Sequence, residues 1–237
     1  MSIERNWKQY QEDVAAYLSA LGFKTKTDEA ISGARGHHDI DVTARYKRAG
    51  ISLLWIIECK LWKRSVPKEA VLTFQAITAD VGADRGLFVA EAGFQKGAVA
   101  AATSTNLTLT SLAQLREKSK KELFEIRLRT LGDRTQEYID RLLALGTTVR
   151  YSSNALERRF PAGLDGSAVI GLTGRLSFMQ ASLREAQRGH WPAPYLIMSS
   201  DIPLFAQDFE ELFQVAEDFL AIVQEALTDL ERTAQGS

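Results

Sequence analysis

The sequence contains little of what disulfide-bonded, zinc-binding or membrane-spanning proteins need. Among 237 residues there are one cysteine and three histidines. A single cysteine excludes a disulfide within the chain, and so few cysteines and histidines disfavour a cysteine-rich zinc site. No apolar stretch is long enough to cross a bilayer, and the first residues lack the apolar core of a signal peptide. We therefore expect a cytoplasmic protein without membrane contact.

The chain also lacks a strong excess of either charge, because 29 basic and 30 acidic residues leave a net charge of −1. This balance conceals an asymmetry between the two halves. Residues 1–120 hold 17 basic and 13 acidic residues, whereas residues 121–237 hold 12 basic and 17 acidic ones. A mildly basic first half suits a surface that binds phosphates.

Helical and strand-like patterns alternate through the first half of the chain. Apolar residues recur at helical spacing as far as Gly22, where a helix should end. Strand patterns follow at residues 23–27, 40–46, 51–57, 87–90 and 107–109, and helical patterns at 66–81 and 95–103. This order predicts an α/β fold, a mixed sheet flanked by helices.

The second half is predicted to be mainly helical. Helical patterns cover residues 112–131, 133–145, 168–188 and 205–233, whereas residues 147–167 are less regular. We therefore divide the chain into a domain of residues 1–118 and a mainly helical region of residues 119–237. The last helix carries an apolar stripe that either packs within the chain or forms a dimer seam. Its members are Phe209, Leu212, Phe213, Ala216, Phe219, Leu220 and Val223.

Charged residues occupy the end of a strand that should be buried. The apolar run at residues 51–57 is typical of a strand buried on both faces, and it ends in Glu58, Cys59 and Lys60. Glu58 and Lys60 should project from one face, and Asp41 lies in the preceding strand. Buried charges cost free energy unless something compensates them. Two carboxylates and a lysine at a strand end suit a divalent metal ion and a polarised water.

This arrangement resembles the PD-(D/E)-x-K nuclease superfamily, and in particular the Mrr-like restriction endonuclease catalytic domain. The resemblance covers about residues 5–118, although Ile40 replaces the proline of the motif. It rests on an ordered set of segments: Tyr10-Gln11, Leu21-Gly22-Phe23, Gly33-Ala34-Arg35-Gly36, Asp41, Glu58-Cys59-Lys60, Gly82-Ala83-Asp84-Arg85-Gly86, Gly93-Phe94-Gln95-Lys96-Gly97 and Asn106-Leu107-Thr108-Leu109. The family implies a restriction-endonuclease-like fold and hydrolysis of DNA phosphodiester bonds with Mg²⁺ or, as a substitute, Mn²⁺.

The resemblance also implies a role for each residue of the motif. Asp41, Glu58 and the backbone carbonyl of Cys59 are the expected metal ligands, and Lys60 is expected to hold or activate the attacking water. Asp39 is the alternative to Asp41, because both should face one side of a strand.

Further positions near the site are left open by the sequence. The first helix should supply Gln11 or, one step around the helix, Glu12, where relatives often have a glutamate. Gln75 occupies a helix position that is often polar in relatives. Several cations and histidines either follow the DNA backbone or are merely solvated: Arg35, His37, His38, Lys63, Arg64 and Lys68.

We therefore expect a metal-dependent DNA endonuclease, for which the resemblance implies a role in restriction or antiviral defence. Two alternatives stay open: a repair or recombination nuclease on the same fold, and a non-cutting nucleic-acid-binding or regulatory subunit. The expected partners are DNA and, through residues 119–237, either a second copy of the chain or another protein of a defence system.

Overall fold

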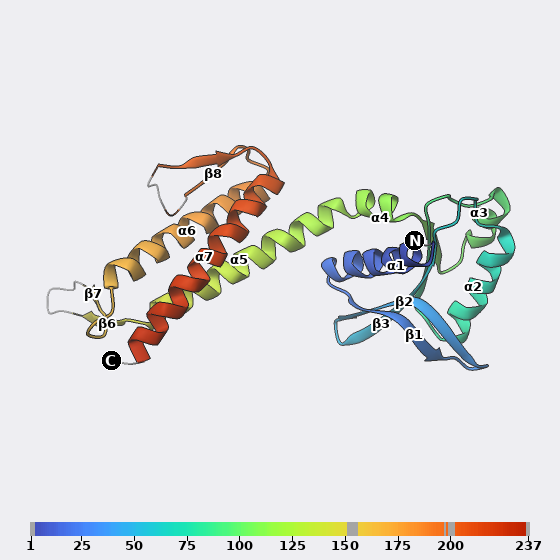
Figure 1. Ribbon diagram of the computed structural model, residues 1–237, viewed down its shortest axis with the longest axis horizontal. Coiled ribbons are helices and arrows are strands. Elements are labelled where there is room, and N and C mark those ends of the chain that lie inside the picture. Colours follow the sequence, from blue (N-terminus) through green and yellow to red (C-terminus); the bar gives the residue numbers. More distant parts are fainter. Residues whose placement is uncertain (1–2, 151–155, 197, 199–201, 236–237) are drawn as a thin grey trace. The chain divides into compact units, whose positions relative to one another are not determined.

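The computed structural model describes residues 3–150, 156–196, 198 and 202–235, and it divides the chain into two compact units (Figure 1). Unit 1 comprises Met1–Leu123 and unit 2 comprises Phe124–Ser237. Within the described residues, no helix has both the length and the apolar character that crossing a membrane requires.

Unit 1 is built on a five-stranded mixed sheet with the strand order β1-β2-β3-β4-β5. The strands are β1 (Lys24–Ser32), β2 (His37–Arg48), β3 (Ile51–Lys60), β4 (Arg85–Ala90) and β5 (Leu107–Thr110). The first three strands pair antiparallel, whereas β3, β4 and β5 pair parallel. The carboxyl ends of β3 and β4 therefore lie at one edge of the sheet.

Helices cover both faces of this sheet, as predicted. Helix α1 (Ile3–Ala20) lies on one side, and α2 (Lys68–Asp80) and α3 (Lys96–Ala102) lie on the other (Figure 1). On the α1 side, Val14 and Leu18 pack with Ile57. On the α2 side, Phe74 packs with Ile56 and Phe88. Neighbouring residues of β3 thus enter opposite cores, which is why this strand is apolar almost throughout.

One helix boundary differs from the prediction. The helical pattern at residues 112–131 is divided into α4 (Leu112–Lys118) and α5 (Lys120–Ala144). The break lies at Ser119, whose hydroxyl donates to the Leu115 carbonyl at 2.6 Å and lies 2.8 Å from the Tyr17 hydroxyl. Gly132, by contrast, does not interrupt α5. The break thus coincides with a contact between Ser119 and Tyr17 of α1, which is distant in the sequence.

Unit 2 is a helical unit with two small hairpins. Its helices are the remainder of α5, α6 (Gly166–Gln187) and α7 (Phe209–Gln235). The hairpins pair β6 (Thr147–Arg150) with β7 (Leu156–Arg159) and β8 (Ala193–Tyr195) with β9 (Leu204–Ala206). Residues of α5, α6 and α7 form one apolar core.

The apolar stripe of α7 belongs to that core. Leu212, Ala216, Leu220 and Val223 are fully buried within unit 2, and Phe219 is nearly so. The sequence left open whether this stripe packs within the chain or forms a dimer seam, and in the structure it packs within the chain. This stripe therefore does not provide the dimer seam.

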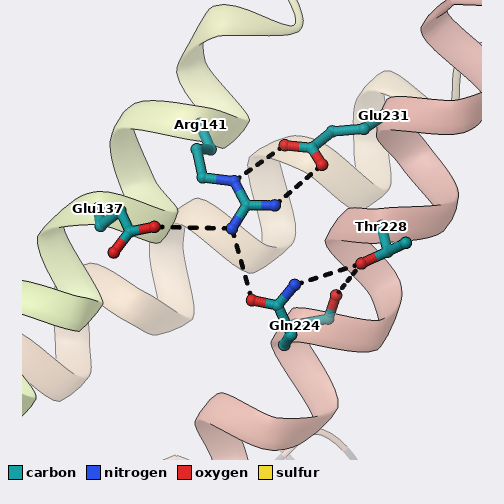
Figure 2. Close-up of polar contacts among 5 residues, drawn as sticks. All are labelled: Glu137, Arg141, Gln224, Thr228 and Glu231. Atoms are coloured by element: carbon teal, nitrogen blue, oxygen red, sulfur yellow. Dashed lines mark hydrogen bonds and ion pairs between the residues drawn. The ribbon is translucent and has the colours of Figure 1, made fainter.

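Polar contacts fix the register between α5 and α7. Arg127 contacts Glu210, and Arg134 contacts Glu217. One heptad further on, Arg141 makes two 2.9 Å hydrogen bonds to Glu231 and a longer one to Gln224 (Figure 2). Both partners advance together by seven residues, so α5 and α7 run in the same direction with coiled-coil-like spacing.

Candidate active site

Asp41 lies where β2 and β3 separate. The ladder between these strands ends at the pair Val42 and Ile57, one residue before Asp41 would face Glu58. The Asp41 carboxylate replaces the missing ladder bond by accepting a hydrogen bond from the Cys59 backbone N–H at 2.8 Å. Its side chain is thereby directed at β3 rather than away from the sheet.

The regular alternation of β2 is interrupted at this position. Ile40 packs in the core beneath α2, whereas Val42 packs beneath α1, although two residues apart should share a face. On the neighbouring strand, Asp28 has a φ of 50°, a left-handed conformation that is uncommon outside glycine. The expectation that Asp39 and Asp41 share one face is therefore wrong. Asp39 is exposed, while Asp41 turns toward β3.

Glu58 and Lys60 join Asp41 at this point, as the spacing predicted. The Lys60 ammonium forms a short ion pair with Glu58 and lies 3.9 Å from Asp41 Oδ2. Burial raises the pKa of Asp41, although the Cys59 N–H and Lys60 oppose this effect. Burial also raises the pKa of Glu58, and the charge of Asp41 adds to the increase. One lysine thus compensates two half-buried carboxylates only in part.

Cys59 turns its thiol away from this cluster. The side chain is fully buried in the core beneath α1, as its position between Glu58 and Lys60 predicted. Burial and then the two nearby carboxylates raise the pKa of the thiol well above its ordinary value. A neutral, inaccessible thiol is no nucleophile. The Cys59 carbonyl accepts a 3.4 Å hydrogen bond from the Trp7 indole N–H, and a carbonyl oxygen has a second lone pair besides the one used here.

Helix α1 brings a buried amide to the site. Gln11 is fully buried, and neither its amide nitrogen nor its amide oxygen has a hydrogen-bond partner within normal limits among the described residues. Gln11 nevertheless lies close enough to Asp41 to lower the pKa of that carboxyl slightly. Glu12 is exposed, and Gln75 is half-buried on α2. A buried amide without a close partner costs free energy, so an ion or a water bound at this site would stabilise it.

This set of donors fits a hard divalent cation. Two carboxylates, one backbone carbonyl and an amide oxygen are the oxygen ligands that Mg²⁺ and similar ions accept. The Gln11 amide without a close partner and the pair of carboxylates that shares one lysine fit such a cation. Across the described part of the chain, no group of three or more histidine, cysteine or acidic side chains could hold a metal. Any such ion would therefore depend on the Cys59 carbonyl, Gln11 or waters.

Other candidate residues are not part of the cluster of Asp41, Glu58 and Lys60. Arg35 and His38 both contact Asp80, at the end of α2, with distances of 3.2 and 2.8 Å. The backbone of Ala34 also donates to the Asp80 carbonyl. These bonds hold the segment that leads into β2. Lys63, Arg64 and Lys68 are exposed, beyond the end of β3.

Two contributors were not predicted from the sequence. Trp7 reaches the Cys59 carbonyl, and the Tyr10 hydroxyl donates to Glu91 at 2.7 Å. Glu91 also accepts from the Leu112 backbone N–H at 2.9 Å. Both contacts join residues more than 50 positions apart in the sequence, so no local sequence pattern predicts them.

Comparison with known proteins identifies the domain that holds this site. Residues 4–118 match the family model Mrr_cat, described as a restriction endonuclease. The comparison with curated proteins finds no match. A solved structure titled "Crystal Structure of Protein of Unknown Function AF1548" is similar to this chain, with 17% identity and a TM-score of 0.41. The similarity covers 94% of this chain and 98% of that one, but it is too low to bear on either unit.

Proposed function

Because residues 4–118 belong to the Mrr-like family of restriction endonuclease catalytic domains, we propose that this chain is a metal-dependent endonuclease that hydrolyses phosphodiester bonds in DNA. The observation that carries the proposal is the partly compensated pair of half-buried carboxylates, Asp41 and Glu58, which shares a single lysine at the splayed end of β2 and β3.

Asp41, Glu58 and the Cys59 carbonyl would hold Mg²⁺, or Mn²⁺ in its place. When bound, the metal supplies charge that polarises the phosphate and lowers the pKa of a coordinated water. The side-chain amide of Gln11 would find its missing partner at the metal site, either by contacting the metal directly or through a water. The Cys59 N–H holds Asp41 in place, because its hydrogen bond restricts the carboxylate to the side of β3.

Lys60 has two tasks in this proposal. In the metal-free arrangement its ammonium compensates Glu58 and, more weakly, Asp41. Once a cation binds the carboxylates, the ammonium is free to orient the attacking water and to stabilise the negative charge that develops on the phosphate. Lysine provides three donors on a flexible stem, which suits this exchange of partners.

The biological role proposed here is restriction of foreign DNA or antiviral defence. The description of the matched family supports this role. The mildly basic composition of residues 1–120 supports DNA as the substrate, since positive charge promotes phosphate binding.

The test is incubation of the pure full-length protein with supercoiled plasmid DNA in Mg²⁺, Mn²⁺ or EDTA. We expect nicked or linear products with either metal and none with EDTA. Asp41→Asn, Glu58→Gln and Lys60→Ala should each lower the cleavage rate by roughly 10²–10⁴, the range that loss of one catalytic group typically produces.

Asp39→Asn is the matched control for Asp41→Asn. Both changes remove one carboxylate from β2, but Asp39 is exposed and Asp41 faces β3. The control should therefore keep most of the activity. Wild-type cleavage by all three site variants would refute the assignment, and greater loss in Asp39→Asn would move the metal site by two residues.

A further inference from the structure

An exposed tryptophan lies directly beyond the strand that carries the proposed catalytic residues. Trp62 follows Lys60 by two residues, and 39% of its surface is exposed. The guanidinium carbon of Arg64 lies 5.9 Å from the centre of the indole ring, at the limit of a cation–π contact. This exposure leaves part of the hydrophobic stabilisation of a large aromatic ring unrealised. A ligand that covered the ring would recover it.

The segment that carries Trp62 is anchored beside the site. The Val66 N–H donates to the Gly93 carbonyl, and the Gln95 N–H donates to the Val66 carbonyl, both at 2.9 Å. The Ser65 hydroxyl donates to the Ala92 carbonyl at 3.1 Å. These bonds join the chain after β3 to the chain after β4. Trp62 is therefore confined between Lys60 and this anchor, with its Cα at most about 7 Å from that of Lys60.

Positive charge surrounds this tryptophan in the sequence. Between Leu61 and Lys68 the chain holds three cations and no carboxylate, and Lys63, Arg64 and Lys68 are all exposed. The first turn of α3 adds Lys96. This turn adjoins Lys68, since a Cβ atom built on Gly97 would lie 3.7 Å from the Lys68 Cβ atom. Cations with an exposed ring among them are the usual means of binding phosphates and stacking bases together.

We propose that Trp62 stacks on an unpaired base of the substrate beside the scissile phosphate, while Lys63 and Lys68 contact the flanking phosphates. Arg64 would hold the indole from its other side. An indole reaches the face of a base only where that base is unstacked, because neighbouring base pairs cover both faces in a regular duplex. The inference rests on the proposed nuclease function and deepens it. It assigns DNA with an unpaired base at the cleavage position, such as a single strand or a gap, as the preferred substrate.

The test measures binding without cleavage. Fluorescence anisotropy of labelled single-stranded, gapped and fully paired DNA would be followed with full-length protein and Ca²⁺ in place of Mg²⁺. We expect Trp62→Ala to weaken binding of single-stranded and gapped DNA roughly tenfold, the effect of losing one stacked base, and to change binding of paired DNA little. Trp62→Phe should retain most of the affinity. Ile51→Ala is the matched control, because it removes another exposed apolar side chain at the opposite end of β3.

A second measurement follows the indole itself. Single-stranded DNA should quench the tryptophan fluorescence of the wild-type protein, and the quenching should decrease in Trp62→Phe, in which the other three tryptophans remain. Equal affinity of wild type and Trp62→Ala for every DNA would overturn the inference. Loss of self-association with unchanged DNA affinity, measured by light scattering, would also overturn it and assign Trp62 to a protein interface.

Failure of this inference can be distinguished from failure of the proposed function. If the protein cuts no DNA in Mg²⁺ or Mn²⁺ but its binding still depends on Trp62, the nuclease function fails and the stacking site stands. If the protein cleaves DNA normally but Trp62→Ala binds every DNA as tightly as the wild type does, the stacking site fails and the nuclease function stands.

Discussion

At the scale of single residues, the character of the site follows from burial of charge. Burial raises the pKa of Asp41 and of Glu58 above their ordinary values. A carboxyl whose pKa is raised in the folded state stabilises the fold below its ordinary pKa, and this contribution is lost as pH rises through the raised value. Above the raised pKa values both half-buried carboxylates are ionised, and without a cation to compensate them this opposes folding.

The first prediction concerns metal and pH together. Mg²⁺ or Ca²⁺ should raise the melting temperature at about pH 8, and the increase should shrink as pH falls through the raised pKa values, because protons then compete with the metal. Differential scanning fluorimetry across pH would measure this. The double variant Asp41→Asn/Glu58→Gln should melt higher than the wild type without metal at neutral pH, and metal should not affect it. A metal effect that survives in the double variant would place the ion elsewhere.

At the scale of elements, Asp80 links α2 to the segment that precedes β2. Its carboxylate contacts Arg35 and His38, and its backbone carbonyl accepts from Ala34. The hydrogen bond from His38, followed by contacts with Arg35, lowers the pKa of Asp80. This contribution to stability is present above the ordinary aspartate pKa and is lost as pH falls through the lowered value.

The second prediction therefore concerns this link. Asp80→Ala should release the segment around Arg35 without unfolding unit 1, so trypsin should cut after Arg35 several-fold faster than in the wild type. Mass spectrometry of a timed digestion would identify the cut. Asp84→Ala is the comparison, since Asp84 holds the Leu54 backbone instead. Equal cleavage after Arg35 in the wild type and Asp80→Ala would show that other contacts hold the segment.

The third prediction tests the role of the α7 stripe. Leu220 is fully buried, whereas Ile222 on the same helix is 48% exposed. Leu220→Ala should lower the free energy of unfolding of unit 2 by about 2–5 kcal/mol, the cost of truncating a packed leucine. Ile222→Ala should change it by less than about 0.5 kcal/mol. Urea denaturation followed by circular dichroism would measure both. A small effect of Leu220→Ala would mean that the stripe is not a core.

At the scale of the whole molecule, the chain combines a catalytic unit with a unit that has its own core. The core of unit 2 is formed by residues from Leu128 to Leu227, and the two cores of unit 1 by residues from Tyr10 to Leu112. Separate cores are what independently folding domains need.

The fourth prediction is that residues 1–123 fold alone and that assembly requires unit 2. The shortened chain should show a cooperative melting transition and should be monomeric in light scattering, whereas the full chain should be a dimer. Paired copies suit cleavage of both strands, since one active site cuts one strand. Because the α7 stripe is buried, the dimer surface would have to lie elsewhere on unit 2. A monomeric full chain would contradict this prediction.

The sequence by itself determined the order of elements in unit 1 and the position of Glu58 and Lys60 at the end of a buried strand. These features are local, because helical and strand periods repeat within a few residues and the end of an apolar run marks the end of a buried strand. Two predictions were wrong because local periodicity does not show the features concerned. These features are the break between helices at Ser119 and the different facing of Asp39 and Asp41.

Only the tertiary structure decided how distant segments meet. It directed Asp41 at the Cys59 N–H, brought the Gln11 amide to the carboxylates without a partner, and buried the α7 stripe against α5 and α6. Periodicity shows that a face is apolar, but not what covers it, because the covering element lies far away in the sequence. The chemistry of the site depends on such distant contacts, since burial and charge from several elements together set the pKa values of its two carboxylates.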